Sequence, residues 1–137
     1  MFAMRKADAT PEPDGEEKDF FQRLRREVER QISTYVYRVP AGALGTPLTA
    51  EEIRFDLDEM LLCLIDPQWE KVNICNTPGE ARTGEGVIRK CVRLAEDEGY
   101  ALVFDPADQE YHLAWRSERG LGTWGIRGDA VGCFLAR

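Results

Sequence analysis

Apolar residues recur with a helical period twice in the first half of the chain. Over residues 19–33 they are separated by arginine and glutamate, which predicts an amphipathic helix. A second helix is predicted from Thr49 to about Asp66, because Thr49-x-x-Glu52 matches a capping box and Pro67 disfavours helical backbone in the residue before it. Its apolar stripe is Ile53, Leu57, Leu61 and Leu64, widened by Met60.

The apolar period changes from helical to alternating in the last third of the chain. A third helix is predicted over residues 85–98, because its apolar residues share one helical face and Gly99 follows as a C-terminal cap. Beyond it, strands are predicted at 100–104 and 110–116 around a type I turn at 105–108. Two more are predicted at 123–127 and 130–135, around a turn at 127–129. Shorter strands are predicted at 34–39 and 69–75, with loops at 41–47 and 76–84.

This order of elements predicts an α+β fold. We expect about three helices packed on one face of a mainly antiparallel sheet, ending in a C-terminal β-meander. Residues 1–17 are predicted to form a flexible tail, because the prolines and charged side chains there bury too little apolar surface to offset the entropy of ordering. Residues 18–137 are predicted to form a single domain, which the length of 137 residues allows.

The net charge of −7 is concentrated in the middle of the chain. Residues 41–110 hold 6 basic and 15 acidic side chains, whereas residues 111–137 hold 4 and 2. An acidic protein is repelled by nucleic acid and by anionic membranes unless it carries a local basic patch. The longest uncharged apolar run, residues 60–65, is far shorter than a membrane span. The charge therefore favours a basic partner protein and no membrane association.

The cysteines point to a reducing compartment. Cys63, Cys75, Cys91 and Cys133 form no Cys-x-x-Cys pair, and the first residues lack a secretory apolar segment. We therefore expect free thiols and a cytoplasmic location. Nothing in the spacing predicts a metal site or a cofactor.

Three motifs resemble catalytic or ligand-binding patterns, but each is better explained by an ordinary structural role. His112 is the single histidine, and nothing places a nucleophile such as Cys75 or Cys133 beside it. The carboxylates at residues 56, 58 and 59 project in different directions from the predicted helix and away from its apolar stripe, as solvated charges do. Gly120-x-Gly122-x-x-Gly125 matches a dinucleotide-binding pattern, but strands rather than a helix are predicted after it, so we interpret it as a turn-rich loop. An enzyme is therefore not favoured.

Two functions of different kinds remain. The first is a small non-catalytic protein that binds another protein, as immunity and adaptor proteins do. Trp and Arg are enriched at interface hot spots, so Trp124 and Arg119 are predicted to anchor the partner. The acidic residues predicted to steer it are Asp56, Glu59, Glu96 and Asp97.

The alternative is a regulator of winged-helix type that binds nucleic acid. Two helices followed by a hairpin match that order, and the helix at 85–98 would present Arg89, Lys90 and Arg93 to phosphates. The long loop between the helices and the acidic hairpin turn weigh against this interpretation.

Overall fold

The computed structural model describes residues 15–38, 42 and 45–137. The elements in chain order are α2 (Gly15–Ser33), α3 (Ala50–Cys63), β1 (Leu64–Ile74), α4 (Pro78–Thr83), β2 (Val87–Asp97), β3 (Tyr100–Asp105), β4 (Glu110–Ser117), β5 (Gly120–Gly128) and α5 (Ala130–Leu135).

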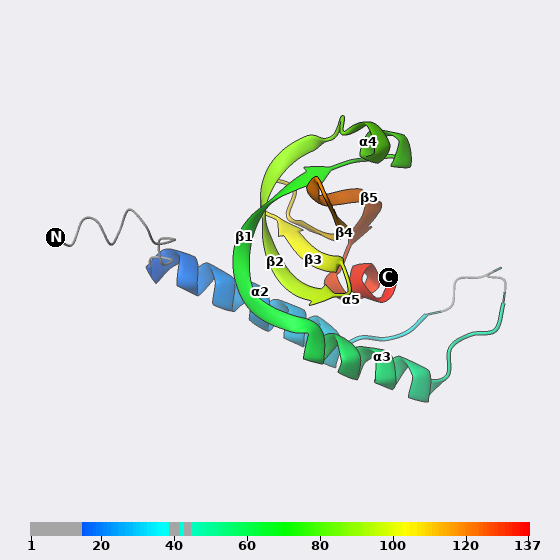
Figure 1. Ribbon diagram of the computed structural model, residues 1–137. Helices are drawn as coiled ribbons and strands as arrows, with labels where there is room; N and C mark the ends of the chain where they lie inside the picture. The colour runs from blue at the N-terminus through cyan, green and yellow to red at the C-terminus, as the bar shows by residue number, and fades with distance from the viewer. Residues whose placement is uncertain (1–14, 39–41, 43–44) are drawn as a thin grey trace.

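The five strands form a closed barrel (Figure 1). Each strand pairs antiparallel with the next one in the chain. Because an up-and-down meander of five strands has an odd number, its first and last strands run parallel where they meet. This closing seam is short: Val72 lies opposite Leu121, and Asn73 lies opposite Gly122.

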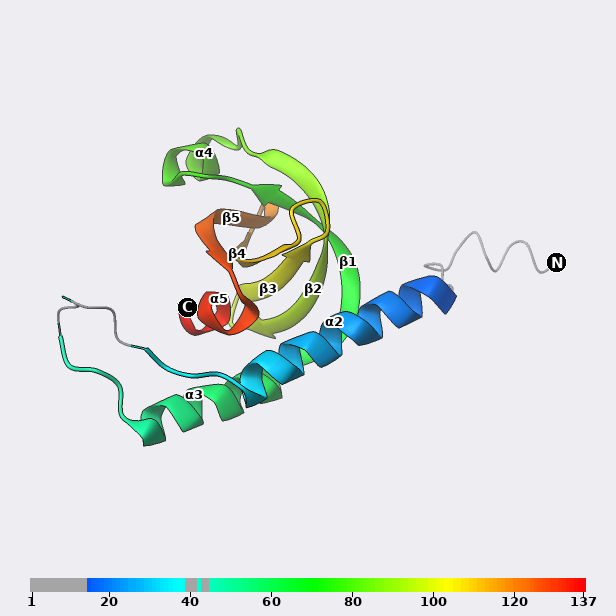
Figure 2. The same ribbon diagram turned by 180° about the vertical axis from the view of Figure 1, so that it is seen from behind.

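Three helices cover one side of the barrel. α2 and α3 run beneath it and meet near their C-terminal ends, α5 packs between them and the strands, and α4 lies at the opposite end beside β5 (Figures 1 and 2). α2 is held there by its buried face, formed by Phe21, Leu24, Val28 and Ile32. α3 begins at the predicted capping box, in which the Thr49 hydroxyl and the Glu52 carboxylate each accept a backbone N–H.

The alternation of strand side chains creates two hydrophobic clusters. The outer cluster joins α2, α3 and α5 to one face of the strands, and includes Leu94, Leu102, Leu113 and Phe134. The second cluster contains strand residues alone, which places it inside the barrel. Its members are Val72, Ile74, Cys91, Ala101, Val103, Ala114 and Leu121. Their modest volume suits the narrow interior of a five-stranded barrel.

The predicted fold class is confirmed: the molecule is α+β, with a meander in its C-terminal half. The helix predicted at 19–33 is part of α2, and the strands predicted at 100–104 and 110–116 are parts of β3 and β4. The strand predicted at 69–75 lies within β1 except for its last residue, Cys75. α2 begins at Gly15, so residues 15–17 of the predicted tail are helical. Residues 1–14 lie outside the described part of the chain.

The helix predicted at 85–98 is wrong, because these residues form strand β2. A β-bulge between Arg93 and Ala95 shifts the register, so that Val92, Leu94 and Ala95 all pack in the outer cluster while Cys91 lies inside. The bulge thus gives a strand an apolar spacing that resembles one face of a helix.

The structure also corrects several other expectations. Residues 130–135 form helix α5 instead of a strand, because the Asp129 carboxylate caps it by accepting the Gly132 N–H. Residues 34–38 form no strand, and residue 39 is not described. The loop at 76–84 contains α4, and β5 begins at Gly120, ahead of the predicted residue 123. The second helix ends at Cys63, and Leu61 is exposed on it.

Candidate functional site

A groove crosses the outer face of the barrel over its closing seam. The strand register places Trp115 opposite Gly122, Gly122 opposite Asn73, and Asn73 opposite Ile88. These four residues form one row across β4, β5, β1 and β2. Gly122 lacks a side chain, so the row is lowered at its centre and flanked by larger groups on both sides.

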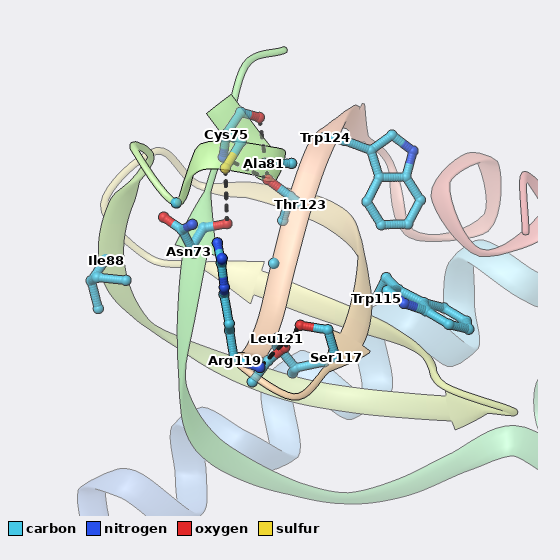
Figure 3. A pocket seen from close by; sticks show the side chains of 13 residues that line it. Asn73, Cys75, Ala81, Ile88, Trp115, Ser117, Arg119, Leu121, Thr123 and Trp124 are labelled. Carbon is cyan, nitrogen blue, oxygen red and sulfur yellow. Dashed lines mark hydrogen bonds between the residues drawn. The ribbon is translucent and has the colours of Figure 1, made fainter. Parts of the chain in front are cut away.

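The groove has a cavity volume of about 320 Å³. Trp115 and Trp124 lie on one side of β5, and the Arg119 side chain runs along the other side toward Asn73 (Figure 3). Ala81 and Gly84 of the α4 region line it as well. The glycine-rich motif at residues 120–125 therefore belongs to strand β5 and does not form the predicted loop. Its small residues leave space that a turn would not provide.

The structure brings the two predicted anchor residues, Trp124 and Arg119, into this groove. Arg119 is exposed, and its Nη1 donates to the carbonyl oxygen of Arg82 at 3.3 Å. That carbonyl lies in the last turn of α4, where the helix dipole favours a cation. The bond orients the guanidinium without neutralising its charge.

Tyr100 connects the groove to an acidic hollow. Its ring lies 4.8 Å from that of Trp115 and 6.5 Å from that of Trp124, measured between centroids. Tyr100 also lines a hollow with Asp56, Asp97, Glu98, Leu135 and Arg137. The aromatic and acidic residues singled out in the sequence are therefore neighbours on one surface.

The four predicted acidic residues divide into two groups. Asp56 and Asp97 line the hollow, and Glu59 lies beside it through Arg137, which pairs with Asp97 at 2.8 Å and with Glu59 at 3.7 Å. Glu96 instead joins an ion-pair network at one mouth of the barrel, where Arg93 and Arg116 each contact both Glu96 and Glu70. Burial opposes ionisation of Glu96, but hydrogen bonds from Arg116 and Arg93 hold its pKa below the ordinary value. Its charge is already compensated within the fold.

The residues predicted for nucleic-acid binding do not lie on a helix. Arg89, Lys90 and Arg93 all belong to β2, so the winged-helix order is absent from the described residues. Arg89 pairs with Asp105 and Asp108, each at 3.0 Å, and Arg93 belongs to the mouth network. Of the three, Lys90 alone points to the outer face without a carboxylate partner among the described residues.

The cysteines and the histidine form no nucleophilic pair. Cys133 packs in the outer cluster, whereas His112 shares the interior face of β4 with Ala114. Burial raises the pKa of Cys91 and of Cys133 to about 12, so both remain protonated thiols. In the described ranges all four cysteines are free, and no cluster of metal-ligating side chains occurs.

Because His112 is buried, we expect the stability of the fold to depend on pH. His112 is 1% exposed, and neither ring nitrogen has a hydrogen-bond partner among the described residues. Burial, helped by Arg127, lowers its pKa against the opposing carboxylates of Asp105, Glu110 and Asp108. The unfolded chain therefore binds the proton first, so the free energy of unfolding should fall as the pH drops below about 6.5, by up to about 1.4 kcal/mol per pH unit.

A comparison of wild type with His112→Leu checks this dependence. The free energy of unfolding of each protein would be measured by urea titration between about pH 7.5 and pH 5, above the titration of ordinary carboxylates. As the pH falls, we expect the free energy of unfolding of wild type to decrease more than that of the His112→Leu variant. Parallel pH profiles for the two proteins would contradict the assignment.

Sequence reasoning missed Tyr100 and Asn73 as site residues. Their importance follows from cross-strand register. The sequence pattern predicts a helix at 85–98 and therefore does not reveal this register. No helix in the described residues has the length and apolar character needed to cross a membrane. Comparisons with models of known families, with characterised proteins and with solved structures find no match.

Proposed function

We propose that this chain is a non-catalytic binding protein that holds a basic segment of a partner protein against its acidic hollow. The observation that carries the proposal is the meeting of carboxylates and partly exposed aromatic rings at Tyr100. Complementary charge accelerates and orients association, while a desolvated ring provides most of the binding energy. The four free thiols support a reducing, cytoplasmic location.

An exposed apolar edge on α3 extends this surface. Asp56 lines the acidic hollow and also a second hollow with Leu48, Glu51, Glu52 and Phe55. Phe55 is 63% exposed, and Leu62, two helical turns further on, is 86% exposed. Large apolar side chains surrounded by carboxylates match a partner helix with an apolar ridge flanked by Lys or Arg.

Trp124 anchors the partner where this surface meets the groove. It is partly buried against the outer cluster and contacts Tyr100, so its ring is held in place before binding. Arg119 lies across β5 from Trp124, and its positive charge would repel a basic segment. The proposal therefore assigns the contact with the partner to the carboxylates, Phe55 and Trp124.

Selection of random peptides on the immobilised protein tests the proposal. Peptides of about 15 residues, long enough for several helical turns, should be enriched in Lys and Arg around apolar residues. For the best peptide, Phe55→Ala and Trp124→Ala should each weaken binding by about fivefold or more. Asp56→Asn should slow association and flatten its dependence on salt.

Asp58→Asn is the matched control. Asp58 is also a carboxylate on α3, but it is 61% exposed, pairs with Arg54, and lines neither hollow. Its loss should leave binding unchanged. Enrichment of neutral or acidic peptides, or equal effects of the Asp56 and Asp58 substitutions, would overturn the proposal.

A further inference from the structure

We propose that the groove over the closing seam binds a nucleotide unit, with its base stacked on Trp115 and its phosphate held by Arg119 and Lys71. The site is distinct from the acidic hollow and takes the opposite charge. Free nucleotides and single-stranded nucleic acid share this chemistry, and the experiment below distinguishes the two sources.

The first argument is the distribution of unpaired cations. The arginines that face the barrel mouths or the C-terminal helix are paired with carboxylates, as shown by Arg116 with Glu70 at 2.9 Å and Arg127 with Glu110 at 2.7 Å. By contrast, no ion pair reaches Lys71, Lys90 or Arg119 from any residue that the structure describes. The outer face around the groove therefore carries unpaired positive charge, although the whole protein has a net charge of −7.

The second argument is the position of these cations relative to the groove. Lys71 precedes Asn73 by two residues on the same face of β1, and it lies directly opposite Lys90 on β2. Like charges opposite each other destabilise a sheet unless an anion lies between or above them. Lys90 is partly accommodated by the ring of Trp69, 4.6 Å from its Nζ. Lys71 does not line the groove itself, but it is exposed beside it, one outward-facing position along β1 from the lining residue Asn73.

The third argument is the exposed indole. Trp115 is 42% exposed, although Tyr100 packs edge-on against it and Gly99 lies under its six-membered ring. Its cross-strand partner is Gly122, so no side chain stands on β5 directly opposite the indole. A fixed aromatic surface beside Lys and Arg is the arrangement by which proteins bind unpaired bases.

An acidic peptide is less well matched to this groove. The carboxylates of such a peptide would pair with Arg119 and Lys71, but they would leave the Trp115 ring exposed. A base and its phosphate use both parts of the site. The cavity of about 320 Å³ is at the lower end of the range for small-ligand pockets, as expected for one base with its sugar.

Fluorescence anisotropy with a labelled oligonucleotide of about eight thymidylates tests the inference at about 20 mM salt, where phosphate contacts are strongest. Quenching of tryptophan emission would be followed in parallel. Two phosphate contacts, one from Arg119 and one from Lys71, should give a slope of about −1.4 for log affinity against log salt. Trp115→Ala should weaken binding by about tenfold, and Arg119→Ala and Lys71→Ala by about threefold or more each.

The controls separate this site from general electrostatics and from loss of folding. Arg54→Ala removes an arginine that is 80% exposed on α3, away from the groove, and should not alter binding. Lys71 and Arg119 are exposed, so their variants should keep the far-ultraviolet circular dichroism of wild type. Thymidine monophosphate and hexaglutamate serve as competing probes.

Each outcome decides the inference. Binding of the oligonucleotide that depends on Trp115 and Arg119 supports a single strand as the source, and equally effective competition by the monophosphate supports free nucleotides. No binding at low salt, equal competition by hexaglutamate, or an equal loss with Arg54→Ala would overturn it. None of these results depends on a basic peptide or on Asp56, so failure here leaves the proposed protein-binding function testable.

Discussion

Replacing Phe134 by alanine is expected to lower the free energy of unfolding by about 3–5 kcal/mol. The Phe134 side chain is fully buried in the outer cluster, at the point where α5 meets α2, α3 and the strands. Truncation removes a large apolar surface from the core and leaves a cavity that three helices and a barrel cannot easily fill. Urea denaturation at neutral pH measures the change through the shift in midpoint at constant slope.

Phe134→Leu provides the matched control for this prediction. Leucine keeps an apolar side chain of similar volume, so it should lower the free energy of unfolding by clearly less than alanine does. A loss below about 1 kcal/mol for Phe134→Ala would contradict the position of α5 in the core. It would instead favour the strand that the sequence pattern predicted for residues 130–135.

Replacing Thr123 by valine is expected to cost about 2–4 kcal/mol. The Thr123 hydroxyl accepts the backbone N–H of Cys75 at 3.0 Å and donates to the Cys75 carbonyl at 3.3 Å. Cys75 is buried, so valine, which has the same shape, would leave a buried donor and acceptor without partners. Thermal and urea unfolding would both report the loss.

Thr123→Ser separates the hydroxyl from the methyl group. Serine keeps both hydrogen bonds and removes one buried methyl, so it should cost about 1 kcal/mol. If serine destabilises the protein more than valine does, the two hydrogen bonds to Cys75 do not hold the seam, and packing inside the barrel does.

The parts of the fold that the sequence predicted correctly depend on local physics. The helix at Ala50–Cys63 begins directly after Thr49 because the side chains of Thr49 and Glu52, three residues apart, satisfy two backbone donors at its start. The strands Tyr100–Asp105 and Glu110–Ser117 surround a turn in which the Asp105 carboxylate accepts the Ala107 N–H. Each of these features is decided within a few residues.

The parts that failed depend on distant contacts. The strand at Val87–Asp97 has apolar residues on both faces because one face lies inside a barrel and the other under helices, and its bulge completes the resemblance to a helix. The groove depends on the same register, which is why Trp124 and Arg119 could be chosen from composition while Asn73 and Tyr100 could not. Closure of the sheet has no local signal at all.

The parallel seam between β1 and β5 also affects how the molecule folds. The strands that it joins are separated by the rest of the barrel, and Cys75 and Thr123 are 48 residues apart in the chain. The antiparallel hairpins form between neighbouring segments, so closing this loop is the step with the highest entropy cost and should come last. The seam is then the natural place for local opening of the native barrel. A ligand that bridges β5 and β1 would hold it shut, so occupancy of the groove would be coupled to the kinetic stability of the whole domain.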